Sequence, residues 1–118
     1  MARFGTLLLS ALLAGCVAGP GPLDPELTYL IRSYYRHHAA ERNYTCLAPE
    51  IRGITRVEVL EDTPTRLVLK IRYHYRDDTY GMDGFLTGRC QDFATRTFVI
   101  DRRDGYRVVG MSGEVRDR

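Results

Sequence analysis

The chain has 118 residues, enough for one small folded domain and for little beyond it. Its 17 lysine and arginine side chains are nearly balanced by 15 aspartate and glutamate side chains. This balance argues against a nucleic-acid-binding protein, because such proteins concentrate positive charge. Glycines and prolines are scattered or concentrated at turns, and only the stretch from Gly15 to Pro25 has the composition of a linker ahead of the folded part.

The chain begins with the layout of an export signal. One positive residue, Arg3, precedes an apolar stretch and a group of small residues. The stretch ends in Leu13-Ala14-Gly15-Cys16, which resembles the lipobox of bacterial lipoproteins at all four positions. The resemblance implies that residues 1–15 are removed, that the Cys16 thiol carries diacylglycerol, and that residues 16–23 tether the domain to the membrane.

Two other interpretations of this segment are weaker. A transmembrane helix needs about 20 apolar residues, and the apolar stretch is shorter than that before Pro20. A secretory signal cut after Ala18 remains an alternative. Under the lipoprotein interpretation, Val17 follows the cysteine where aspartate would mark retention, so enterobacterial sorting rules favour the periplasmic face of the outer membrane.

The other two cysteines predict a disulfide. With Cys16 assigned to lipid, Cys46 and Cys90 form an even pair in an oxidising compartment. A reactive thiol or a metal pair is the alternative, but the chain has no Cys-x-x-Cys and no histidine at ligand spacing. The acidic residues of the glycine-bearing loop, Asp77, Asp78 and Asp83, lack the spacing of a calcium loop. We therefore expect no metal site.

A helix is predicted next. Asp24 is a suitable N-cap and Pro25 suits the first helical position. Residues at spacings of three and four form one stripe that we expect to be buried: Leu27, Leu30, Ile31, Tyr34 and His38. We expect the helix to run to about Arg42.

From Ile54 onward the period of the pattern changes to two, which indicates strands. The clearest strand alternates an apolar face with a basic face. The apolar face holds Leu67, Leu69, Ile71, Tyr73 and Tyr75, and the basic face holds Lys70, Arg72, His74 and Arg76. A third strand is expected over 92–102, and Asp104-Gly105 predicts a hairpin into a fourth strand over 106–111.

These elements predict an α+β domain over residues 24–113, with one N-terminal helix packed across a four-stranded antiparallel sheet, and a tail over 114–118. The element order and the closing hairpin at 96–109 resemble the cystatin-like and NTF2-like folds. The resemblance implies a helix lying across a curved sheet. The further helices that roof a conical pocket in NTF2-like proteins are missing.

Two groups of residues are candidate sites. His38 on the helix and three tyrosines, Tyr34, Tyr73 and Tyr75, are expected to line a small polar cleft for a ligand or for proton transfer. The alternative is a core histidine bound to a phenol. The basic row Lys70, Arg72, His74 and Arg76 suits lipid phosphates or an acidic partner, and the alternative is an ordinary solvated strand face.

No nucleophile motif, phosphate-binding loop or carboxylate pair is present, so we expect neither catalytic residues nor a cofactor. Two functional hypotheses remain. In the first, the protein is a non-enzymatic interaction or structural module, anchored by the lipid on Cys16 and docked onto another envelope protein. In the second, it is a small-ligand-binding NTF2-like module or enzyme that uses the cleft.

Overall fold

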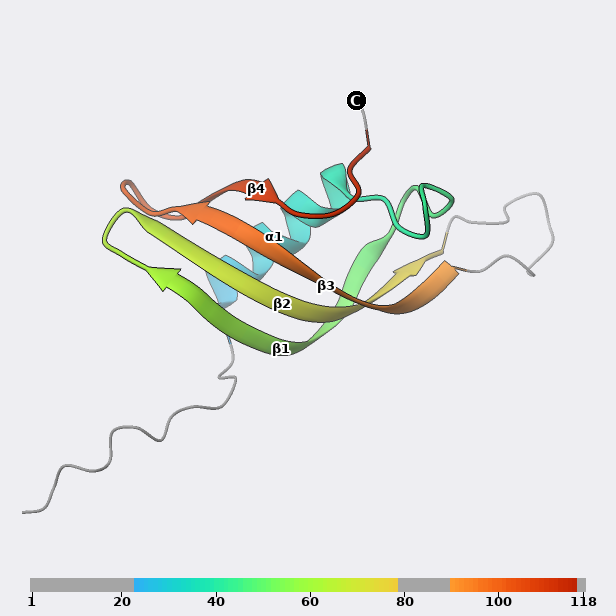
Figure 1. Cartoon of the computed structure of the whole chain (residues 1–118), viewed down its shortest axis with the longest axis horizontal. Coiled ribbons are helices and arrows are strands. Elements are labelled where there is room, and N and C mark those ends of the chain that lie inside the picture. Colours follow the sequence, from blue (N-terminus) through green and yellow to red (C-terminus); the bar gives the residue numbers. More distant parts are fainter. Residues whose placement is uncertain (1–22, 79–89, 117–118) are drawn as a thin grey trace, which may run out of the picture.

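The computed structural model describes residues 23–78 and 90–116 (Figure 1). Its elements are the helix α1 (Pro25–His38) and the strands β1 (Glu50–Asp62), β2 (Arg66–Asp77), β3 (Cys90–Asp101) and β4 (Arg107–Met111). The strands pair antiparallel in chain order, and α1 lies across one face of the sheet (Figure 1). The predicted α+β arrangement is therefore confirmed. Within the described ranges, no helix is long and apolar enough to cross a membrane.

The helix begins where the sequence predicts and ends earlier. Asp24 caps it by accepting a hydrogen bond of 2.8 Å from the Glu26 N–H. At the other end, Ala39 adopts an extended conformation and pairs with Val115. The expected end near Arg42 was wrong because backbone pairing with a distant segment competes with another helical turn.

The buried stripe of α1 also differs from the predicted one. Leu27, Ile31 and Tyr35 are the fully buried residues of the helix. Tyr34 and His38 are half-buried and lie on the flank of this stripe. Tyr35, which the predicted stripe omitted, is 0% exposed and belongs to the core.

Strand β2 follows the predicted alternation. Its five inward residues are all buried: Leu67, Leu69, Ile71, Tyr73 and Tyr75. Phe98 and Ile100 of β3 complete the core on this face of the sheet. The neighbouring β1 begins earlier than predicted and contains three register shifts, one of them at Leu60, where the sequence alternation breaks.

Residues 114–116, which were expected to be a tail, are part of the fold. The Arg116 N–H donates to the His38 carbonyl at 2.7 Å, and the Ala40 N–H donates to the Glu114 carbonyl at 3.1 Å. The Glu114 carboxylate also accepts hydrogen bonds from two backbone N–H groups, those of Asn43 and Tyr44. These two residues have positive φ angles, so the C-terminal segment stabilises an otherwise unfavourable loop conformation.

The predicted disulfide is present. Cys46, in the loop after α1, is bonded to Cys90 at the start of β3, with 6.1 Å between the Cα atoms. Beside it lies Asp77, which is buried and accepts a hydrogen bond of 3.0 Å from the Ala48 N–H. The bridge therefore joins the loop that follows the helix to the first residue of the inner strand β3.

Candidate functional site

The four residues of the predicted cleft fall into two groups. Tyr34 and His38 stack on the flank of α1 with ring centroids 4.2 Å apart, beside a shallow opening of about 250 Å³. Tyr73 and Tyr75 lie in the core, where Tyr73 meets the Tyr35 ring at a centroid distance of 5.1 Å. This opening is not lined by Tyr73 or Tyr75. The cause is the rotation of the helix, which turns Tyr35 rather than Tyr34 toward the sheet.

Tyr35 and Tyr73 belong to a buried polar network that the sequence did not reveal. The Tyr35 and Tyr73 hydroxyls both donate to the same Glu41 oxygen, at 2.7 and 2.5 Å. The Arg96 guanidinium lies 3.2 Å from that oxygen, and its side chain is 3% exposed. Burial raises the pKa of each phenol, and the Glu41 carboxylate raises it further. Both tyrosines therefore remain protonated hydrogen-bond donors.

Arg96 also binds three backbone carbonyls from two parts of the chain. Its Nη1 donates to the carbonyls of Ser112 and Glu114, both at 2.8 Å, and its Nη2 donates to the Ala40 carbonyl. Its Nε donates to the Tyr73 hydroxyl at 2.8 Å. Since these donors are satisfied within the protein, the network acts as a structural clasp.

One sequence signal would have indicated the clasp. Arg96 is at an inward position of β3, on the same face as Phe98 and Ile100. A charged residue at a buried position of an alternating strand needs an internal partner. Glu41, in the loop after the helix, gave no such signal, because its burial depends on the early end of α1.

The predicted basic row lies on the sheet face opposite α1. Lys70 and Arg72 are exposed, and His74 and Arg76 are half-buried. Arg76 forms an ion pair with Asp78 at 2.5 Å. The row is therefore not uniformly available, and Arg76 lies at its neutralised end.

An aromatic residue and a further arginine extend this row. Phe93 is 47% exposed, with the Arg72 guanidinium 4.6 Å from its ring centroid and the His74 ring 5.0 Å away. Arg56 of β1 is the direct cross-strand partner of Arg72. We call this surface the basic face and define it by five residues: Arg56, Lys70, Arg72, His74 and Phe93.

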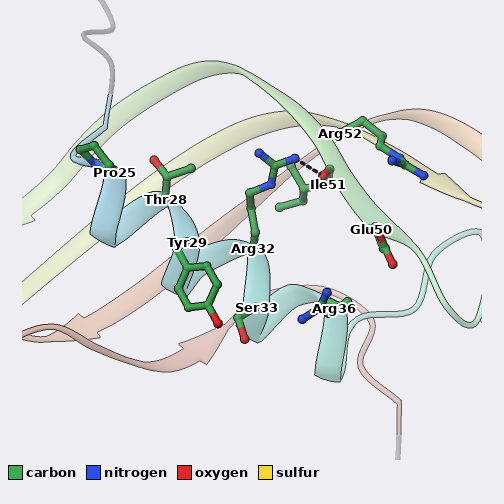
Figure 2. A pocket seen from close by; sticks show the side chains of 9 residues that line it. All are labelled: Pro25, Thr28, Tyr29, Arg32, Ser33, Arg36, Glu50, Ile51 and Arg52. Atoms are coloured by element: carbon green, nitrogen blue, oxygen red, sulfur yellow. Dashed lines mark hydrogen bonds between the residues drawn. The ribbon is translucent and has the colours of Figure 1, made fainter.

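A groove opens on the other side of the sheet, between α1 and the start of β1, with a volume of about 510 Å³ (Figure 2). The Arg32 side chain reaches across it and donates to the Ile51 carbonyl at 2.8 Å (Figure 2). Its lining includes Thr28, Tyr29, Arg32, Ser33, Arg36 and Glu50. No motif in the sequence indicated this groove, because its two walls come from segments that meet only in the fold.

The described residues contain no group of three histidine, cysteine, aspartate or glutamate side chains placed to hold a metal ion. Asp83 and the lipobox, including Cys16, lie outside the described residues. Comparisons of the chain with protein-family models, curated proteins and solved structures found no match. The likeness to cystatin-like and NTF2-like folds therefore stays a prediction from element order.

Proposed function

We propose that this chain is a lipid-anchored protein of the bacterial cell envelope whose domain docks, without catalysis, onto an acidic surface of another envelope protein. The anchor rests on the lipobox-like sequence that ends at Cys16. The short tether that follows leads directly to the Asp24 cap, so the domain is held close to the bilayer. By its sorting residue, Val17, we place the protein on the periplasmic face of the outer membrane.

The observation that carries the docking proposal is the pairing of Arg56 with Arg72. Like charges directly opposite each other on neighbouring strands destabilise a sheet. Neither arginine, nor Lys70 beside them, has a carboxylate within ion-pair distance among the described residues. An acidic partner surface would relieve this repulsion. The free energy that the like charges cost in the free protein would then favour formation of the complex.

Phe93 adds the apolar part of an interface. Arginine and aromatic side chains are enriched where protein interfaces concentrate their binding energy. Here the Arg72 guanidinium lies over the exposed Phe93 ring, so one contact would bury both groups. A partner that offers carboxylates around an apolar spot matches this pattern.

The alternative function, a small-ligand-binding module or enzyme that uses His38 and the tyrosines, has less support. The Tyr35 and Tyr73 hydroxyls are committed to Glu41. Tyr34 and His38 lie at an opening of only about 250 Å³, below the range of about 300–1,000 Å³ that is usual for ligand pockets.

The test is site-specific cross-linking in intact cells. A photoreactive residue replaces Thr95, which is exposed and is the cross-strand partner of Arg72. We expect one envelope protein to be captured, and we expect the double variant Arg56→Glu and Arg72→Glu to abolish the capture. Reversing acidic residues on the identified partner should restore it. Arg103→Glu, an exposed change away from the basic face, is the control.

Stability separates docking from folding in this experiment. Exposed substitutions usually change the free energy of unfolding by less than about 0.5 kcal/mol, so the docking variants should melt near the wild-type temperature. If the double variant folds and still captures the partner, docking through the basic face is wrong. If His38→Ala removes function while the double variant retains it, the alternative function is supported instead.

A further inference from the structure

The groove between α1 and β1 carries positive charge that the described residues leave unneutralised. Arg32 and Arg36 are four residues apart on α1 and therefore share one side of the helix. Neither has a carboxylate within ion-pair distance in the described parts of the chain. Arg52, which also lines the groove, is different because it forms an ion pair with Asp78, a carboxylate that it shares with Arg76. The lining thus favours an anion beside Arg32 and Arg36.

The same groove offers groups that suit hydroxyl-bearing molecules. Thr28 and Ser33 contribute hydroxyls, and Glu50 contributes a carboxylate that accepts hydrogen bonds. The side chains of these three residues form no hydrogen bond with the rest of the described structure. A carboxylate in a cationic groove works against a simple anion, so Glu50 points to a ligand with donors of its own.

Tyr29 supplies an apolar wall. Its side chain is 65% exposed and stands beside Arg32 and Ser33 at the mouth of the groove (Figure 2). A tyrosine presents a flat apolar face together with a polar end, and the C–H face of a sugar ring can pack against such a surface. The volume of about 510 Å³ lies within the range of about 300–1,000 Å³ that holds small ligands.

We propose that this groove binds an acidic sugar. The carboxylate or phosphate of the sugar lies against Arg32 and Arg36, its ring packs on Tyr29, and its hydroxyls bond to Glu50 and Ser33. The groove is on the helix side of the sheet and the basic face is on the opposite side. The sugar site therefore does not depend on docking, and the two proposals can fail separately.

The test uses the exported protein, purified from the envelope in an uncharged detergent. Glucuronate, glucose 6-phosphate and glucose are titrated at constant ionic strength while the arginine Nε–Hε signals are followed by NMR. We expect one or both acidic sugars to shift the Arg32 and Arg36 signals saturably, and glucose to bind at least about tenfold more weakly, since hydrogen bonds to charged groups are the stronger ones. The stronger acidic sugar identifies carboxylate or phosphate as the anion.

Variants connect the signals to the groove. Arg36→Gln should weaken binding at least about tenfold, and Tyr29→Ala should weaken it as well. Arg66→Gln, an equal loss of charge at an exposed site elsewhere, should leave it unchanged. Arg36 is preferred over Arg32 because the Arg32 side chain holds α1 to the Ile51 carbonyl, and its loss could disturb the fold.

Several results would overturn the proposal. If glucose binds as well as the acidic sugars, the arginines do not contribute to binding. If acetate binds as well as glucuronate, the sugar ring does not contribute. Folded Arg36→Gln with unchanged affinity would place any binding elsewhere. If phosphatidylglycerol in the detergent shifts the Arg36 signal and neither sugar does, the groove binds lipid headgroups instead.

Discussion

At the scale of single residues, Gly113 shows how closely the clasp is packed. Its φ angle is 92°, a conformation that side-chain-bearing residues rarely adopt, and a Cβ atom there would lie 2.8 Å from the Arg96 Nη1. Because Arg96 is held by the Glu41 carboxylate and by backbone carbonyls, it has little freedom to move away. Glycine at this position thus adopts the positive φ angle readily and leaves room for the Arg96 side chain.

We therefore expect Gly113→Ala to destabilise the protein more than two matched substitutions do. Gly105 has a similar φ of 83° but open space around it. The loss of unfolding free energy in Gly105→Ala therefore measures only the cost of the positive φ angle, about 1–2 kcal/mol. Gly53→Ala has neither problem and should change stability little. Denaturant unfolding ranks the three. Equal losses at Gly113 and Gly105 would mean that Arg96 yields to the added methyl group.

The buried phenols predict a dependence of stability on alkaline pH. Burial raises the pKa of Tyr73 above its ordinary value of 10.0, so the folded protein keeps the proton that the unfolded chain releases. The stabilisation is therefore complete below about pH 10 and is lost as the pH rises further, by about 1.4 kcal/mol per pH unit for one group.

Tyr73→Phe tests this dependence. The variant is less stable at pH 8 because the Glu41 carboxylate loses a donor. The difference in unfolding free energy between wild type and variant should shrink between pH 10 and pH 11. The wild type loses stability there as its Tyr73 phenol ionises in the unfolded chain, whereas the variant has no phenol at this position. Urea unfolding across this range measures the difference, with Tyr29→Phe, an exposed ring, as the control. A deficit that stays constant would contradict the inferred shift.

At the scale of elements, a helix or strand could be predicted when the residues that determine it are close together in the sequence. β2 could be predicted because its alternation is complete within twelve residues and one face meets the core. The Asp24 cap and Pro25 are equally local. These signals sufficed for the α+β architecture.

The end of the helix and the clasp could not be predicted for the opposite reason. Ala39 leaves the helix to pair with Val115, 76 positions later in the sequence, and no local pattern records that preference. Once the helix ends there, Glu41 is placed under the sheet, where it meets Arg96. One long-range pairing thus decides both the boundary of α1 and the composition of the buried network.

The disulfide is the covalent link between these elements. Loop-entropy arithmetic for a separation of 44 residues gives about 4 kcal/mol. Cys46→Ser, Cys90→Ser and the double variant should therefore each lower the melting temperature by a similar amount, because all three lose the same cross-link. Thermal unfolding with and without reductant measures it. Quantitative alkylation of both cysteines in the folded, unreduced protein would contradict the bridge.

At the scale of the whole molecule, the two proposed surfaces lie on opposite sides of one thin sheet. α1 covers one side of the sheet (Figure 1). The groove lies on that side, and the basic face is on the other. The proposed tether would enter the domain at Asp24, the cap of α1, so the proposed anchor would be connected to the helix layer that carries the sugar site. A domain of two layers can therefore serve a ligand on one side and a protein partner on the other without overlap.

The anchor determines whether this arrangement operates at a membrane. If Cys16 ends a lipobox, cells grown with labelled fatty acid should incorporate the label into this protein, and Cys16→Ala should abolish the incorporation. Two or more acyl chains are needed for stable attachment, so the unlabelled variant should also leave the membrane fraction. Cys46→Ser and Cys90→Ser are matched controls that should retain both the label and the attachment, since neither cysteine belongs to the lipobox. A Cys16→Ala protein that still carries the label and sediments with membranes would show that the lipid is attached at another residue. The localisation on which the docking proposal rests would then lose its basis.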